Sequence, residues 1–164
     1  MSEAIAYYPG CSGLGTSKEY DASTRAVCRA LGLSLVDIPD WSCCGSTPAH
    51  TKDHVLSAAL SARNLQLVAG MGIGAAATPC PSCLTNLRTA NHRMEAPAMA
   101  EKVNKLLDDP YAGGVEAISI LQALVEKIGV DDMKAAVRTP LSGLKVACYY
   151  GCIMNRPPEL MAFD

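Results

Sequence analysis

Five cysteines follow one another in an order that indicates metal or redox chemistry. Cys11 is followed after thirty-one residues by the adjacent pair Cys43 and Cys44, and after thirty-five more by Cys80 and Cys83 in the motif CPSC. Thiolate sulfur is a soft ligand that suits iron–sulfur clusters and zinc, and a C-x-x-C motif lets two sulfurs of one turn reach the same metal region. Either metal would explain the CPSC pair alone.

The number of thiols favours iron over zinc. A structural zinc ion closes at four ligands, so one of the five thiols would be left over. Adjacent side chains of an extended backbone point to opposite faces, so Cys43 and Cys44 more easily bind different metals of one cluster than one small ion. A disulfide between these two cysteines would need a strained ring that is readily reduced. The pattern therefore predicts a polynuclear iron–sulfur centre, with zinc as the alternative.

The composition is that of a folded, mildly acidic protein. The chain has 164 residues, of which 49% are hydrophobic and 18% charged, and its formal net charge is −2. This charge gives no electrostatic support for binding nucleic acid. The most apolar stretch, residues 65–79, is too short to span a bilayer. We expect neither a nucleic-acid partner nor insertion into a membrane.

The first residues, MSEAIAYYPG, contain neither a basic region nor an apolar run. They predict no secretory signal, and we therefore expect a cytoplasmic location. In that reducing compartment, the eight cysteines of the chain are more typical of metal or redox chemistry than of a disulfide framework.

Alternating strands and helices predict how the thiols are positioned. Strands are expected at residues 4–8, 33–38, 74–78, 116–119 and 144–149. Helices are expected at residues 17–31, 52–69, 95–107 and 120–128, with another beginning at Pro81. This order is typical of an α/β fold with a mainly parallel sheet and helices on both faces. Because right-handed crossovers place the strand-to-helix turns at one edge, we expect the cysteine loops to gather at the C-terminal ends of the strands.

A short repeat predicts two units of unequal length. The segment IAYYPGC at residues 5–11 resembles VACYYGC at residues 146–152, apart from one deleted residue. We expect a first cysteine-rich domain at residues 1–143 and the start of a second, truncated repeat at residues 144–164.

Three stretches, YYPGC, DIPDWSCCG and TPCPSC, resemble the cysteine-rich CCG domain found in the B-type polypeptide of heterodisulfide reductase and in its bacterial relatives. The family pattern is a lone cysteine, a double cysteine followed by glycine, and a C-x-x-C motif at spacings like those found here. The resemblance spans residues 1–164 and its cysteine pattern is specific.

The resemblance implies a cofactor, an activity and partners. The ligands it implies for a non-cubane 4Fe-4S cluster are Cys11, Cys43, Cys44, Cys80 and Cys83, with Cys152 as the opening ligand of a second cluster. It further implies an oxidoreductase subunit that reduces a disulfide of the CoM-S-S-CoB type or a bacterial equivalent. Electrons would come from flavin- and iron–sulfur-containing subunits of the A and C type. The second CCG and C-x-x-C motifs do not occur in the chain, so full catalysis is not expected of this chain alone.

Two other functions stay open. The chain could be a non-catalytic module that relays electrons for another oxidoreductase, or one that binds zinc. It could also be a thioredoxin-like thiol oxidoreductase that uses CPSC, since the predicted strand-to-helix turn lowers a thiol pKa. The last interpretation leaves Cys11 and the Cys43–Cys44 pair without a role.

Further residues have ordinary structural interpretations beside functional ones. We expect Cys28 and Cys148 to be buried as small hydrophobic residues rather than to bind metal. His50 and His54 follow the double cysteine and could supply a proton to a product thiolate, although surface histidines are common. Trp41 could shield a cluster from water or belong to the ordinary core.

Overall fold

The computed structural model describes residues 4–46, 48–149 and 152–161, and within them the strands form one parallel sheet. The strands are β1 (Ile5–Tyr7), β2 (Leu35–Asp37), β3 (Ala75–Thr78) and β4 (Glu116–Ser119). Their order is β2-β1-β3-β4, and every neighbouring pair is parallel. The α/β class and the parallel sheet predicted from the sequence are confirmed.

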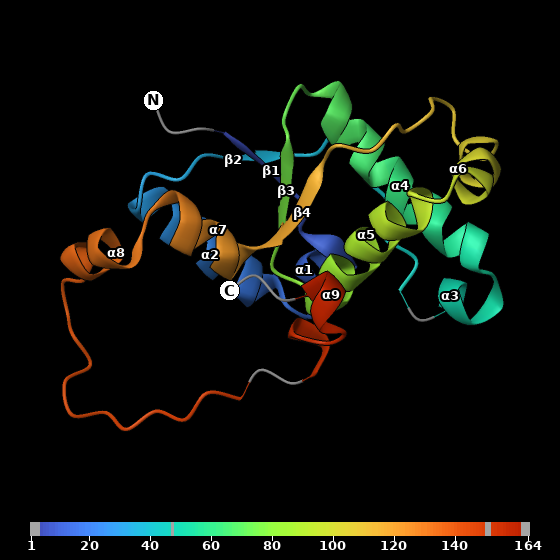
Figure 1. The fold of residues 1–164 in the computed structure, drawn as a ribbon. Coiled ribbons are helices and arrows are strands. Elements are labelled where there is room, and N and C mark those ends of the chain that lie inside the picture. The colour runs from blue at the N-terminus through green and yellow to red at the C-terminus, as the bar shows by residue number, and fades with distance from the viewer. Residues whose placement is uncertain (1–3, 47, 150–151, 162–164) are drawn as a thin grey trace.

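Helices cover both faces of this sheet (Figure 1). They are α1 (Gly10–Leu14), α2 (Lys18–Ala30), α3 (Pro48–Lys52), α4 (His54–Gly70), α5 (Pro81–Met94), α6 (Pro97–Asn104), α7 (Ile120–Lys127), α8 (Val130–Ala136), the 3-10 helix η1 (Cys152–Met154) and α9 (Pro158–Met161). Helices α2 and α7 lie on one side of the sheet, and α4, α5 and α6 lie on the other. No helix among the described residues is both long and apolar enough to cross a membrane.

The alternation of side chains along β1 explains the two layers. Ile5 and Tyr7 are buried in one apolar cluster with Cys28 of α2, whereas Ala6 is buried in the opposite cluster with Leu65 of α4. Successive residues of a strand point to opposite faces, so a strand that is apolar throughout requires cover on both sides. The prediction that Cys28 is a buried structural residue is confirmed.

The helix predicted at residues 52–69 corresponds to α4, and the short helix α3 directly before it was not predicted. Asp53 has extended backbone angles, and its carboxylate accepts a hydrogen bond from the Leu56 N–H at 2.8 Å. This arrangement caps the first turn of α4, because an N-cap side chain satisfies an otherwise unpaired amide. The cap therefore ends one helix and starts the next.

The strand predicted at residues 144–149 is absent from the described structure. This segment leaves the body of the molecule as an extended loop (Figure 1), and Val146 and Tyr149 are 72% and 99% exposed. A strand forms where a neighbouring strand accepts its hydrogen bonds and a covering layer buries its side chains, and this segment has neither. The prediction that Cys148 is buried is wrong for the same reason, since it is exposed.

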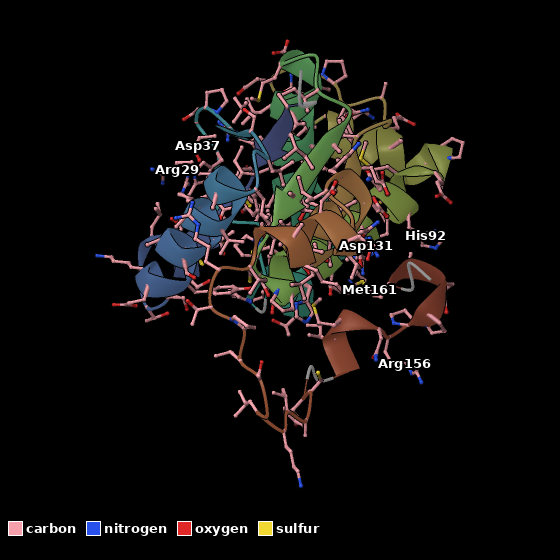
Figure 2. The ribbon with its side chains drawn as sticks, turned by 90° about the vertical axis from the view of Figure 1, so that its left-hand side faces the viewer. Arg29, Asp37, His92, Asp131, Arg156 and Met161 are labelled. Carbon is pink, nitrogen blue, oxygen red and sulfur yellow. The ribbon has the colours of Figure 1, made fainter. Side chains whose placement is uncertain are left out.

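Beyond this loop, residues 152–161 return to the body of the molecule. Met161 is buried, and Arg88 of α5 donates hydrogen bonds to the carbonyl oxygens of Leu160 and Met161 at 3.0 and 3.1 Å. In Figure 2, Met161 lies against the domain, whereas Arg156 projects outward. The C-terminal segment is thus anchored to α5, the helix that begins at Pro81 within the CPSC motif.

Candidate metal centre

Three neighbouring strands deliver the predicted cysteines to one edge of the sheet. Cys11 lies in α1 directly after β1, Cys43 and Cys44 lie in the loop after β2, and Cys80 and Cys83 follow β3. Because β2, β1 and β3 are adjacent and parallel, their carboxyl ends meet at the same edge. The expected gathering of the cysteine loops is confirmed.

The thiols contact one another across these loops. The sulfurs of Cys44 and Cys83 lie 3.5 Å apart. Cys80 acts on the pKa of Cys83, and Cys11 acts on the pKa of Cys43, so the thiols of each pair also lie close to each other. The structure therefore brings together all five cysteines that the sequence predicts as ligands of the first cluster.

Two glycines allow close packing at the cysteine site, one against a thiol and one against α4. A Cβ atom at Gly10 would lie 2.9 Å from the Cys83 sulfur, and Gly10 has a φ of +70°. A Cβ atom at Gly45, the glycine of the CCG motif, would lie 2.8 Å from Cδ1 of Leu60, and its φ is +78°. Both positions combine a left-handed backbone with close packing, so glycine is required at each.

Buried polar side chains hold the double-cysteine loop in place. Asn64 of α4 accepts a hydrogen bond from the Ser42 N–H at 2.9 Å and donates one to the Ser42 carbonyl oxygen at 3.0 Å. The Tyr8 hydroxyl donates to the same carbonyl oxygen at 2.6 Å, and Ser61 donates to the carbonyl oxygen of Cys44 at 3.0 Å. A loop fixed in this way presents its thiols without reorganisation.

Tyr8 lies on the buried side of the cysteine site. It is fully buried, and its ring packs edge-on against Trp41 with the ring centroids 5.2 Å apart. Burial and the neighbouring thiols, Cys44 foremost, raise the pKa of Tyr8 far above its usual range. The phenol therefore stays neutral and serves as a hydrogen-bond donor. Trp41 packs against the core, as its ordinary structural interpretation predicts.

The local environment favours the thiolate at two of the cysteines. A hydrogen bond from Cys83 and the backbone N–H groups of Cys83 and Ser82 lower the pKa of Cys80 to about 5, against the opposing effect of burial. Cys83 likewise lowers the pKa of Cys44 to about 7, with help from the Ser46 N–H and Asn86. The pKa of Cys83 itself is raised, because it faces Cys44 and Cys80 and is buried. Thiolates are the form that binds metal.

The donor set fits an iron–sulfur cluster in its chemistry. It consists of soft sulfur donors alone, two of which have a lowered pKa, and Gly10 leaves room beside the Cys83 sulfur. Within the described residues, no three His, Cys, Asp or Glu side chains are arranged to hold a metal ion. The five thiols lie next to one another in smaller groups, and they do not surround a single position that one metal ion could occupy.

A small, mainly apolar pocket lies beside the thiols at the carboxyl ends of β3 and β4. It encloses about 200 Å³, and Cys80 forms part of its wall. Leu84, Ile120 and Met154 also line it. Met154 lies two residues after Cys152, whose backbone belongs to η1 and whose side chain lies outside the described residues. The pocket therefore joins the first cysteine site to the C-terminal segment.

His50 and His54, the two candidate proton donors, are both exposed. His50 is exposed in α3, and Nδ1 of His54 lies 3.2 Å from Nη2 of Arg93 on an exposed surface.

The sequence did not predict a role for Asn64, Ser61 and Asn86, which form hydrogen bonds with the cysteine loop. For Ser61 and Asn64, the available signal was a polar residue on an otherwise apolar helix face, as in the segment SARNLQLV.

Comparisons with known proteins identify the family. Residues 5–88 match the model of the CCG family, described as a cysteine-rich domain, and the chain belongs to this family. The chain is 34% identical over 167 residues to the 8-methylmenaquinol:fumarate reductase membrane anchor subunit of Wolinella succinogenes, covering 100% of this chain and 57% of that protein. It is 32% identical over 158 residues to a protein of Archaeoglobus profundus named as like the B-type polypeptide of heterodisulfide reductase, covering 92% and 52%. The resemblance inferred from the cysteine motifs is confirmed.

The chain spans about half the length of these curated relatives. A solved structure, described as a hypothetical protein from Helicobacter pylori, shares the fold with a TM-score of 0.65 and 16% sequence identity. That comparison covers 77% of this chain and 26% of the other. It supports the α/β architecture.

Proposed function

We propose that the chain supplies one half of a disulfide-reducing site in a heterodisulfide reductase-like complex. Cys11, Cys43, Cys44, Cys80 and Cys83 would bind a non-cubane 4Fe-4S cluster. Residues 1–143 would form the first CCG domain, and residues 144–164 would begin a second one. Cys152 would then serve the second cluster.

The observation that carries this proposal is the meeting of thiols from three loops at one sheet edge. Zinc would employ four of them and leave one unused, whereas a cluster of several irons has places for all five. The family membership and the heterodisulfide reductase-like relative from Archaeoglobus profundus give independent support. When bound, the cluster would supply electrons one at a time to a disulfide.

The residues around the thiols have separate roles in this proposal. Tyr8 and Trp41 would keep water from the inner side of the site, since both rings pack there. The pocket beside Cys80 would receive the disulfide, because its apolar wall suits an aliphatic thiol and it extends toward Met154. Its position between Cys80 and the segment after Cys152 agrees with a substrate held between two cysteine sites.

The proposed partners are flavin- and iron–sulfur-containing subunits of the A and C type in the cytoplasm, where thiols persist as ligands.

A specific observation favours a second candidate function. The Wolinella succinogenes relative is named as the membrane anchor subunit of a fumarate reductase, whose reaction involves no disulfide. In an electron-relay role in a membrane-attached complex, the same cysteines would bind the cluster, and the pocket beside Cys80 would bind no substrate.

Metal analysis of the anaerobically purified chain tests the site. We expect about four irons and four acid-labile sulfides per chain, and a loss of most of both in Cys43→Ser. The matched control is Cys28→Ser, because Cys28 is buried on the opposite face of the sheet. Zinc without sulfide, or an iron content that Cys43→Ser leaves unchanged, would contradict the proposal.

Reduction of a disulfide by the assembled complex separates the two functions. A disulfide-reducing site predicts that thiols form as a reduced viologen dye is oxidised, two electrons for each disulfide. Filling the pocket with Leu121→Trp, at an exposed residue of its wall, should raise the KM for the disulfide. Dye oxidation that depends on a quinone or fumarate and forms no thiol would support the relay instead.

A further inference from the structure

Asn86 of α5 reaches a proposed metal ligand from outside the set of five cysteines. Its Nδ2 atom donates a hydrogen bond to the Cys44 carbonyl oxygen at 3.3 Å and lies 3.7 Å from the Cys44 sulfur, within reach of an N–H···S hydrogen bond. A side-chain amide carries two N–H groups, so Asn86 can serve both acceptors at once. Cys44 is buried, which shields both contacts from water.

Ser61 of α4 provides a natural comparison. Its hydroxyl donates to the same Cys44 carbonyl oxygen at 3.0 Å. The two side chains therefore share the task of fixing the Cys44 backbone, and the contact of Asn86 with the sulfur is additional. A structural role and an electronic role of Asn86 can be separated on this basis.

We propose that Asn86 sets the reduction potential of the bound cluster through its hydrogen bond to the Cys44 sulfur. The inference rests on the proposed iron–sulfur site. A hydrogen bond to a cluster thiolate offsets negative charge on the sulfur, and this effect is larger in the reduced state, which carries one more electron. Asn86 acts through Cys44 and is thus a positioning residue that raises the potential.

A potentiometric titration of the iron-loaded chain tests this inference. Dithionite supplies the electrons, and the cluster signal in electron paramagnetic resonance reports the reduced fraction. Asn86→Leu removes the donor at similar volume, and we expect about a tenfold smaller equilibrium constant for one-electron reduction, which equals a shift of about 59 mV to lower potential. Ser61→Ala loses a bond to the same carbonyl oxygen but no contact with the sulfur, so it should shift the potential less than Asn86→Leu does.

Equal potentials in wild type and Asn86→Leu would overturn the inference, and so would equal shifts in the two variants. The second pattern would mean that Asn86 only fixes the loop. Both outcomes leave the proposed function intact, because they require a loaded cluster. A wild-type chain that binds no iron and sulfide would instead refute the proposed function itself.

A second measurement needs only the wild-type chain and so does not depend on whether Asn86→Leu folds. In protein grown with isotope-labelled asparagine, pulsed electron paramagnetic resonance should detect coupling between the cluster and one labelled amide nitrogen with its exchangeable proton. Absence of the coupling in the loaded wild-type protein would overturn the inference.

Discussion

Cys44 and Cys83 belong to loops that follow different strands, and their sulfurs lie 3.5 Å apart although 39 positions separate them in the sequence. The parallel order β2-β1-β3 creates this proximity, because it places the ends of all three strands at one edge. The same edge holds Cys11, Cys43 and Cys80. Because five thiols from three loops meet at this edge, the geometry of the cysteine site should be sensitive to small changes in backbone position.

Gly10→Ala should remove metal binding. The new Cβ atom would lie 2.9 Å from the Cys83 sulfur, so the ligand or the α1 backbone must move. Gly32→Ala is the matched control, because Gly32 has a similar φ of +75° and nothing within 4 Å of the new atom. Both variants should lose about 1–2 kcal/mol of unfolding free energy from the left-handed backbone. Chemical denaturation and iron analysis should show that Gly10→Ala alone loses iron, and equal iron in both would contradict the geometry.

Asn64→Ala should weaken both the fold and the cysteine site. Asn64 is buried and forms hydrogen bonds with both backbone groups of Ser42, so its loss leaves the Ser42 N–H unsatisfied and should cost about 1–3 kcal/mol. Asn104 binds the N–H and carbonyl oxygen of Tyr111 in the same way, far from the cysteines, and Asn104→Ala is the control. Urea denaturation should show a loss in both variants, with iron lost from Asn64→Ala alone. Unchanged iron in Asn64→Ala would mean that the loop does not depend on this side chain.

In the metal-free protein, a less exposed thiol should react faster than a more exposed one. At about pH 7, iodoacetamide should modify half-buried Cys80 faster than exposed Cys43, because thiolates are the reactive form. Cys83 lowers the pKa of Cys80 to about 5. The Gly45 N–H acts to lower the pKa of Cys43, but burial and neighbouring thiols outweigh it and leave the pKa raised.

The difference between these thiols should shrink as the pH rises. Cys80 is already a thiolate at neutral pH, whereas Cys43 becomes one only above its raised pKa. Mass spectrometry of the labelled peptides gives both rates. Faster labelling of Cys43 at neutral pH would contradict the assigned environments.

Arg88→Met should release the C-terminal segment without loss of metal. Arg88 donates to the carbonyl oxygens of Leu160 and Met161, and the apolar replacement leaves these groups without their partner. Hydrogen exchange of α9 should become faster. Arg93→Met is the control, since Arg93 lies on the same helix and contacts His54 at the surface. Slow exchange in Arg88→Met would show that other contacts anchor the segment.

The order of strands and helices was predictable because its signals are local. Periodic apolar residues, Pro81 and the turn glycines mark the elements within a few positions, and parallel topology then brings the cysteines together. The segment 144–149 has the composition of a strand, yet Val146 stays exposed because strand formation depends on a neighbour that sequence pattern does not reveal. The contacts of Asn64 with Ser42 and of Asn86 with Cys44 link positions 22 and 42 apart, so they follow from the three-dimensional packing alone.

The most direct measurement is a crystal structure of the anaerobic, iron-replete chain with anomalous scattering recorded at the iron absorption edge. We predict several iron atoms in one group, bonded to the sulfurs of Cys11, Cys43, Cys44, Cys80 and Cys83. A single zinc ion at this edge, or irons bound without Cys11 and Cys43, would contradict a shared polynuclear centre.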